Sequence, residues 1–512
     1  MRNRRTCPRI SDGSHRFDSK GDNSFVRRLV VALILINATY VVCAQGTFQD
    51  VYNNFKQQAQ TDYEDFRQKA NKEYADWMRQ AWEWHQKIAP MPRPKDEMLP
   101  PVIYNKEKEQ TAPKPIPHDD VEPIPEPKPQ PKPIAPIREN DGDYRIASFT
   151  FFGTEGHVRL PKGDAFKLKG KNEEAYAVAW EVLSSERYNN LIRDCLALRM
   201  EHQLCDWAYL MMLGAMSESI CGKGTNEAVL MQAFVFCQSG YKIRLGFTKE
   251  KDLRLLVKSE HTIFDLDGFK MDDGIFYLLQ STDYDGLNIC DISYPEEKPL
   301  SLWIAQEQKF AESKTKERQL IPLDSLIGIK TQVNENLVSF YNTYPTSMVG
   351  EDIVSRWAIY ANTPLSTCVK DKLYPQLRAI IQKAENKFVA ASWLLYWVQT
   401  AFVYEYDDKV WGHDRAFFAE ETLFYPFCDC EDRSILYSSL VRDLLGLDVI
   451  LVFYPGHLAT AVAFSEIVDG DYVELYGKHY TICDPTYIGA PIGATMPDMD
   501  NKAAKVVLLD RK

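Results

Sequence analysis

Apolar residues recur at helical or strand spacing in several stretches, most clearly near the C-terminus. Within residues 434–445 they return every three or four positions, which predicts a helix that stops at Gly446. Residues 448–454 are apolar and β-branched and residues 457–464 alternate, which predicts two strands joined by a Pro-Gly turn. Residues 480–484 predict a third strand. Helices and strands in this order indicate an α+β domain.

A related pattern occurs earlier in the chain, after a helix-like region at residues 173–219. Residues 224–247 can be set beneath residues 430–453 without a gap, and Gly240 then falls on Gly446, Ile243 on Val449, Leu245 on Leu451 and Phe247 on Phe453. We infer a degenerate duplication in which Gly224 takes the place of Cys430. The first copy therefore lacks a nucleophile, and we interpret its His261 as an ordinary strand-end residue.

The regions around these copies have weaker patterns. Residues 337–341 and 354–360 predict short strands in a β-rich connector that covers residues 299–370. Residues 373–406 are helical and aromatic-rich, and residues 407–421 form a polar insertion that could rim a cleft.

The N-terminal residues have the pattern of an export signal. Arg27 and Arg28 precede an apolar run at residues 29–36, and small residues follow at 42–44. The run is too short for a membrane span. We expect a signal peptide at residues 1–44, cleavage without lipid attachment at Cys43, and a protein of the bacterial periplasm or cell surface, or one that is secreted, with no membrane span after signal removal.

An 11-residue repeat follows the signal. Its three copies start with Tyr and carry Phe or Trp three positions later, at 52/55, 63/66 and 74/77. Eleven residues make three helical turns, so the aromatic side chains form one stripe on a helix that we place at residues 45–88. Residues 48–84 could bind a partner or self-associate, or the helix could pack on its own domain.

Residues 89–141 are rich in proline. Fifteen of the 28 prolines lie between Pro90 and Pro136. This composition favours extended polyproline II and argues against an independent core, so we predict a linker with the role of a spacer.

Composition and charge limit the possible functions. The net charge of −12 argues against nucleic-acid binding. Nine of the 11 cysteines follow Ala44. An odd number leaves at least one thiol unpaired within the exported chain.

The candidate chemistry lies at the start of the C-terminal helix. Cys430 stands where free backbone N–H groups and the helix dipole stabilise a thiolate. His457 and Asp484 follow at equal intervals of 27 residues on predicted strands, as a base and the group that orients it. In residues 457–463 the alternation places His457 with three alanines on one face, which we expect to face the helix. A zinc site or a Cys428–Cys430 disulfide are weaker alternatives.

These residues resemble the transglutaminase-like superfamily, including its bacterial cysteine-peptidase branch. The resemblance rests on a Cys at a helix start, a His on the next strand and an Asp-Pro at the end of a later one, and covers about residues 373–512. It implies a transglutaminase-like or papain-like α+β fold, with a Cys-bearing helix packed on an antiparallel sheet that bears His and Asp. We therefore assign residues 371–512 to a catalytic domain and residues 142–298 to a degenerate unit.

The resemblance implies a Cys430–His457–Asp484 triad without a cofactor or metal, acting on a protein or peptide substrate. We expect hydrolysis by a peptidase or amidase. A protein cross-linking transglutaminase and a non-catalytic envelope scaffold remain alternatives. One feature is discordant, because acidic residues flank the thiol at Asp429, Glu431 and Asp432 and negative charge raises the pKa of a thiol.

Overall fold

The computed structural model describes residues 45–80, 82–95, 99–106, 114–117, 137–163, 166–279, 284–323 and 328–510. The chain separates into two compact units, residues 1–62 and residues 63–512. Of the first, the structure describes residues 45–62, which are helical. The predicted export signal lies outside the described residues, and so does a large part of the predicted linker.

The repeat-bearing helix is α2, Gln45–Met78. It ends before residue 88 because Glu83–Ile88 form a strand, β1. The C-terminal half of α2 packs on the protein's own core. The ring of Tyr74 lies 4.7 Å from that of Trp180, whose indole N–H donates to Asn71 at 2.9 Å. This half of the helix is therefore largely an internal packing element.

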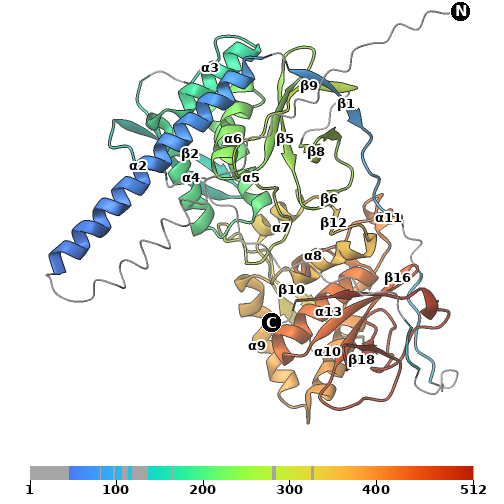
Figure 1. Cartoon of the computed structure of the whole chain (residues 1–512). Helices are drawn as coiled ribbons and strands as arrows, with labels where there is room; N and C mark the ends of the chain where they lie inside the picture. Colours follow the sequence, from blue (N-terminus) through green and yellow to red (C-terminus); the bar gives the residue numbers. More distant parts are fainter. Residues whose placement is uncertain are drawn as a thin grey trace, which may run out of the picture. The chain divides into compact units, whose positions relative to one another are not determined.

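We call the region that follows the first lobe, and it combines helices with a closed barrel (Figure 1). Its hairpin and helices are β2 (Tyr144–Phe151), β3 (Thr154–Pro161), α3 (Glu173–Ser184), α4 (Asn189–Glu201), α5 (Asp206–Cys221) and α6 (Asn226–Gln238). Helix α6 begins where the Thr225 side chain accepts the backbone N–H of Ala228, a regular N-cap.

The barrel has the strand order β1-β7-β8-β5-β4-β9. Its further strands are β4 (Ile243–Phe247), β5 (Leu253–Lys258), β7 (Gly268–Met271), β8 (Gly274–Leu278) and β9 (Gly286–Cys290). Strand β1 pairs with both β7 and β9 and so closes the barrel. Seven apolar residues, including Phe269 and Phe276, fill a separate small core.

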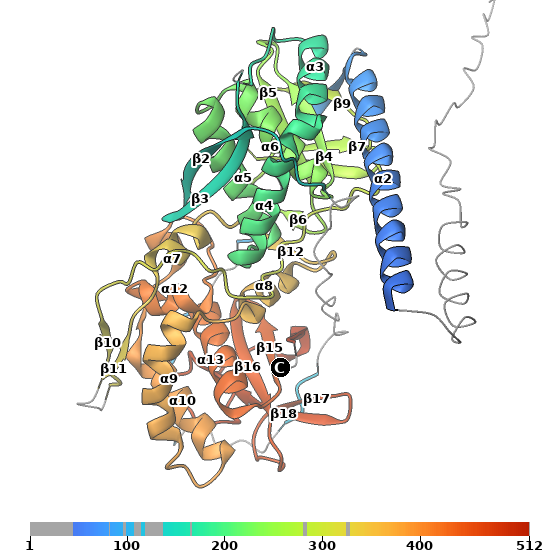
Figure 2. The same ribbon diagram turned by 90° about the vertical axis from the view of Figure 1, so that its left-hand side faces the viewer.

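The second lobe places helices against an open antiparallel sheet (Figure 2). Its helices include α8 (Arg356–Asn362), α9 (Thr367–Ile381), α10 (Lys387–Ala401) and α13 (Cys430–Leu445). Its strands are β15 (Val449–Tyr454), β16 (His457–Ala463), β17 (Tyr472–Leu475), β18 (Lys478–Cys483) and β19 (Lys505–Leu508). The sequence-based prediction of an α+β protein with antiparallel sheets is confirmed.

The two lobes share one topology. The sheet of the second lobe has the order β19-β15-β16-β18-β17, and the barrel contains the corresponding order β9-β4-β5-β8-β7. In each lobe a helix, α6 or α13, immediately precedes the two central strands, and the neighbouring strands pair antiparallel. This agreement supports our inference of an internal duplication.

The sheet of the second lobe faces α13 with different residues from those expected. Leu458 and Val462 share the main core with α13, whereas Ala459 and Ala461 lie in a separate core with Ile450. The prediction that the alanines face the helix is therefore wrong. His457 shares the face of these alanines by alternation and stacks on Tyr454 of the same separate core. Alternation was read correctly, but it does not say which of the two faces receives the helix.

The connector contains more helix than expected. Residues 337–341 belong to α7 (Glu335–Tyr341), and residues 354–360 run through a 3₁₀ turn into α8. The side chains of Asn334 and Asp352 cap these elements. β-Branched and aromatic residues favoured strands, but the caps and tertiary packing favour helices. Two short strands, β10 (Arg318–Leu320) and β11 (Ile329–Thr331), pair as a hairpin.

Parts of the Pro-rich region are bound to the second lobe. Ile103 forms a parallel β-bridge with Ile488, and Pro115 forms another with Tyr472 on β17. The Ile116 side chain is buried in the core behind the sheet. These described residues are therefore structural partners of the second sheet, although the segment has the composition of a spacer.

Candidate active site

Cys430 is the first residue of α13, a helix that packs against strand β16 (Figure 1). The Ser434 hydroxyl donates to the carbonyl of Leu458 at 2.8 Å, which ties the first turn of α13 to strand β16. The backbone N–H of Leu458 also donates towards the Cys430 sulfur. The thiol therefore lies beside the backbone of the residue that directly follows His457.

His457 and Asp484 are in direct contact. His457 Nε2 lies 2.8 Å from Asp484 Oδ2, and both side chains are buried. The other carboxylate oxygen of Asp484 accepts the backbone N–H groups of Thr486 and Tyr487, at 2.9 and 3.2 Å. These bonds fix the orientation of the carboxylate, so it can accept a hydrogen bond from Nε2 and leave Nδ1 as a base.

The second ring nitrogen of His457 has no hydrogen-bond partner. Nδ1 is buried and unpaired, which is costly for a polar atom unless it serves another purpose. In the described conformation the Cys430 thiol instead donates to Glu431 Oε2 at 3.2 Å. The structure thus contains a thiol bonded to an acid, and a base that lacks a partner.

Four carboxyl groups gather near the start of α13. They belong to Asp407, Asp429, Glu431 and Asp432, and all are buried. Burial and the neighbouring carboxylates raise the pKa of Asp429 and Asp432 well above the usual value, and raise that of Asp407 to about 8. Burial, Glu431 and Asp429 likewise raise the pKa of the Cys430 thiol. The described state therefore favours a neutral thiol.

Three of these acids could hold a cation. One oxygen each from Asp407, Asp429 and Glu431 lies within 4.8 Å of the others. Glu431 Oε1 is buried without a hydrogen-bond partner. Carboxylate oxygens are the ligands that Ca²⁺ and Mg²⁺ prefer. A cation here would cancel the charge that disfavours the thiolate.

Two residues that hold the site together were not identified from the sequence. Gln399 on α10 donates to the carbonyls of Asp484 and Ala490 and accepts the N–H of Gly489. Asp407 begins α11 (Asp407–Val410), inside the polar insertion, and joins the acid cluster. Sequence patterns could not reveal either contact, because each joins elements that are far apart in the chain.

The zinc and disulfide alternatives receive no support from the cysteine geometry. Cys428 donates to the Val403 carbonyl and Cys483 to that of Thr481, at 3.9 and 3.6 Å. All nine cysteines in the described part of the chain are free thiols. Among the same residues, the three acids above are the group of possible ligands close enough to share an ion.

The first lobe lacks the corresponding chemistry. Gly224, aligned with Cys430, lies in the turn two residues before the first residue of α6, whereas Cys430 is itself the first residue of α13. Strand pairing matches Phe247↔Leu253 with Phe453↔Leu458, so Asp252 takes the place of His457. His261 lies 5.8 Å from the Trp303 ring, edge-on, in the core.

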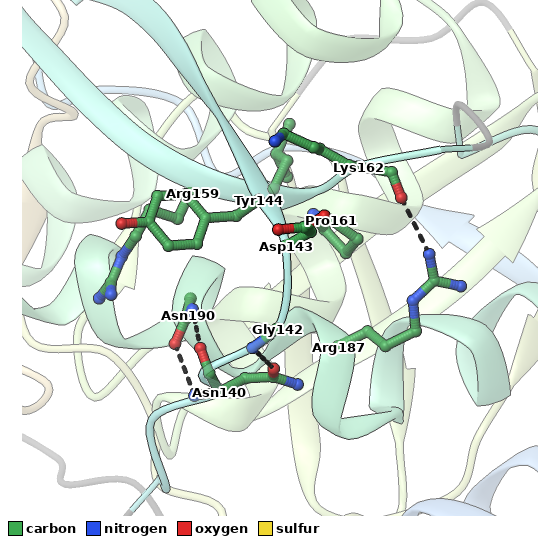
Figure 3. A pocket seen from close by; sticks show the side chains of 10 residues that line it. Asn140, Gly142, Asp143, Tyr144, Arg159, Pro161, Lys162, Arg187 and Asn190 are labelled. Atoms are coloured by element: carbon green, nitrogen blue, oxygen red, sulfur yellow. Dashed lines mark hydrogen bonds between the residues drawn. The ribbon is translucent and has the colours of Figure 1, made fainter.

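A cavity of about 220 Å³ opens in the first lobe, and none of the candidate site residues named above lines it (Figure 3). Asn190 donates to the Asn140 carbonyl and accepts its N–H, as a peptide group would. Arg187 reaches across to the Lys162 carbonyl at 3.2 Å. The lining has no cysteine or histidine, so it offers no nucleophile–base pair.

Comparisons with models of protein families, with curated proteins and with solved structures found no match for this chain. A search of the described helices for one long and apolar enough to cross a membrane also found none.

Proposed function

We propose that this protein is an exported cysteine-dependent enzyme that acts on protein or peptide amides through Cys430, His457 and Asp484. We favour hydrolysis, as in a peptidase or amidase of the transglutaminase-like superfamily. The observation that carries the proposal is the buried His457–Asp484 pair, with its unpaired Nδ1, at the start of the strand that contacts Cys430.

The chemistry requires each of these groups. His457 Nδ1 takes the thiol proton as Cys430 Sγ attacks the amide carbon, and the new C–S bond forms a tetrahedral oxyanion. The proton then passes to the leaving amine as the C–N bond breaks. Water, deprotonated by the same imidazole, releases the acid and regenerates the thiol. Asp484 stabilises the imidazolium throughout.

The described conformation corresponds to a resting state in this proposal. The thiol is bonded to Glu431, and it must turn to Nδ1 before it can be activated. Binding of substrate, or of a cation by the acid cluster, would favour that change by removing the competition from Glu431.

The scaffold alternative has one specific observation in its favour. Burial and the adjacent acids raise the pKa of the thiol, and the first lobe carries Gly224 in the equivalent place. A protein that uses both lobes only for binding would tolerate these features.

The test offers the purified full chain a peptide library, with and without a primary amine and with added Ca²⁺. Cys430→Ala is the inactive variant and Cys428→Ala the matched control. Cleavage that depends on Cys430 supports the peptidase, and amine incorporation without cleavage indicates the transferase. If no condition gives a product that depends on Cys430, the proposed enzyme is wrong and the non-catalytic scaffold is favoured.

A further inference from the structure

The chain's own residues 99–104, which we call the strap, lie against the loops that present the base and its acid. The backbone N–H of Leu99 donates to the Gly456 carbonyl at 2.9 Å, and Gly456 directly precedes His457. Ile488, four residues after Asp484, donates to the Val102 carbonyl and accepts from Tyr104, each at 2.9 Å. The strap thus bridges the two loops as an added extended strand would.

We call the surface that the strap covers its seat. Apolar side chains of the strap also pack on this surface. Leu99, Val102 and Tyr104 pack on a small core of Tyr487, Ala490 and Met496. The rings of Tyr104 and Tyr487 meet edge to face, with centroids 5.5 Å apart. A groove with backbone partners and an apolar floor recognises an extended peptide by its main chain and by alternate side chains.

Something that covers the site must move before a substrate can react. Cys430 is 0%, His457 1% and Asp484 2% exposed, and a peptide carbonyl must contact the sulfur atom directly. The strap contacts the loops next to His457 and Asp484, and its own residues are only partly buried. Ile103 is 75% exposed, and Pro100 and Pro101 have no N–H to donate.

We propose that this seat is the groove for an extended, apolar peptide substrate, and that the strap occupies it in the resting protein. This inference rests on the proposed function. Leu99 is followed by two prolines, so the Leu99–Pro100 bond is a tertiary amide without an N–H. In this respect the strap differs from an ordinary peptide substrate.

The first test removes the strap's hydrogen bonds in the full chain. Leu99→Pro with Tyr104→Pro deletes two N–H donors, and proline suits an extended backbone. Leu99→Ala with Tyr104→Phe keeps both donors and serves as the matched control. We expect iodoacetamide to label Cys430, followed by peptide mapping, about fivefold faster for each hydrogen bond lost. An unchanged rate in a folded proline variant would overturn the inference.

A milder variant covers the case in which the proline variant does not fold. Tyr104→Ala removes the ring that packs on Tyr487 but keeps every backbone bond of the strap. We expect faster labelling of Cys430 in the same direction, and Tyr104→Phe should match the original chain. Equal rates for Ala and Phe would count against the groove.

The second test measures binding directly. A fluorescent peptide with the sequence of residues 99–106 is titrated into the proline variant that also carries Cys430→Ala. We expect binding to this variant, about tenfold weaker binding when the strap is intact, and none by a scrambled peptide. Equal binding of both peptides would overturn the inference.

These readouts separate the two proposals because neither needs turnover. If the protein binds the peptide specifically but shows no Cys430-dependent activity, the proposed function is wrong and the groove proposal still holds. If activity depends on Cys430, release of the strap leaves KM unchanged and the peptide does not bind, the groove proposal is wrong and the proposed function still holds.

Discussion

The two lobes share one arrangement of a helix and five strands. They differ in the residues at the start of the helix and at the start of one strand. In the first, Thr225 caps α6 and Gly224 and Asp252 stand at the key positions. In the second, α13 begins with Cys430, beside a His–Asp pair and buried acids. Shared topology therefore does not define a site. The difference arises from a few residues at helix and strand ends.

The largest effect should come from replacing His457, the proposed base. The matched comparison replaces Asp252, which holds the equivalent position in the first lobe. His457→Ala removes the proposed base for the thiol, and we expect turnover to fall by on the order of 10³-fold or more. Asp252→Ala, the equivalent change in the first lobe, should leave turnover unchanged because its carboxylate pairs only with the exposed Lys171 in that region. Peptide hydrolysis by the two variants measures the contrast, and equal losses would break it.

A second change removes support that is present only in the second lobe. Gln399→Leu deletes three hydrogen bonds to the loop after Asp484 and leaves buried backbone groups unpaired. We expect the free energy of unfolding to fall by about 1–3 kcal/mol, with kcat falling further because the carboxylate loses its position. Leu213→Met, a volume-conserving change in the buried α5, is the control. A variant that loses stability but keeps kcat would contradict this role.

A third prediction concerns the acid cluster, which has no counterpart described at the start of α6. Ca²⁺ bound by Asp407, Asp429 and Glu431 would stabilise the folded protein by mass action. We expect the melting temperature to rise by a few degrees in millimolar Ca²⁺ and to fall back with chelator. Asp407→Asn should abolish this shift, whereas Asp408→Asn, on the exposed side of α11, should retain it. An equal shift in both variants would assign the ion elsewhere.

The smallest effect is a pH dependence from another buried acid of the second lobe. Burial raises the pKa of Glu420 to about 7. A carboxyl with a raised folded-state pKa contributes stability below about pH 4.5, and this is lost as the pH rises through 7. The slope is about 1 kcal/mol per pH unit in this interval. Denaturant unfolding of Glu420→Gln should show a flatter profile, and an unaltered slope would exclude this carboxyl as its source.

The sequence predicted the elements around the site well, because local signals define them. Periodicity and Gly446 located α13, apolar β-branched residues located β15, and alternation located β16. The strand order and the closure of the barrel by β1 depend on pairing between strands that no single stretch contains. The transglutaminase-like assignment stays a prediction.

The site was less accessible to sequence reasoning than the fold. His457 and Asp484 could be paired from their spacing and residue types. The partner of Cys430 could not, because the sequence does not show that His457 lies on the face of β16 opposite the core shared with α13. Asp407 and Gln399 reach the site through tertiary packing alone. Alternation in β16 identified two faces but not which one meets α13.

The early part of the chain has a consequence for the order of folding. Strand β1 pairs with β7 and β9, which lie roughly two hundred residues later in the chain. The strap bonds to residues 456 and 488, which lie nearly four hundred residues later. Contacts this distant in sequence form slowly, since the intervening chain must be organised first. During synthesis both lobes can gather helices and hairpins, but the barrel cannot close until β9 has emerged, and the strap cannot settle until almost the whole chain exists. The protein should therefore close its barrel and bind its strap among its last folding events.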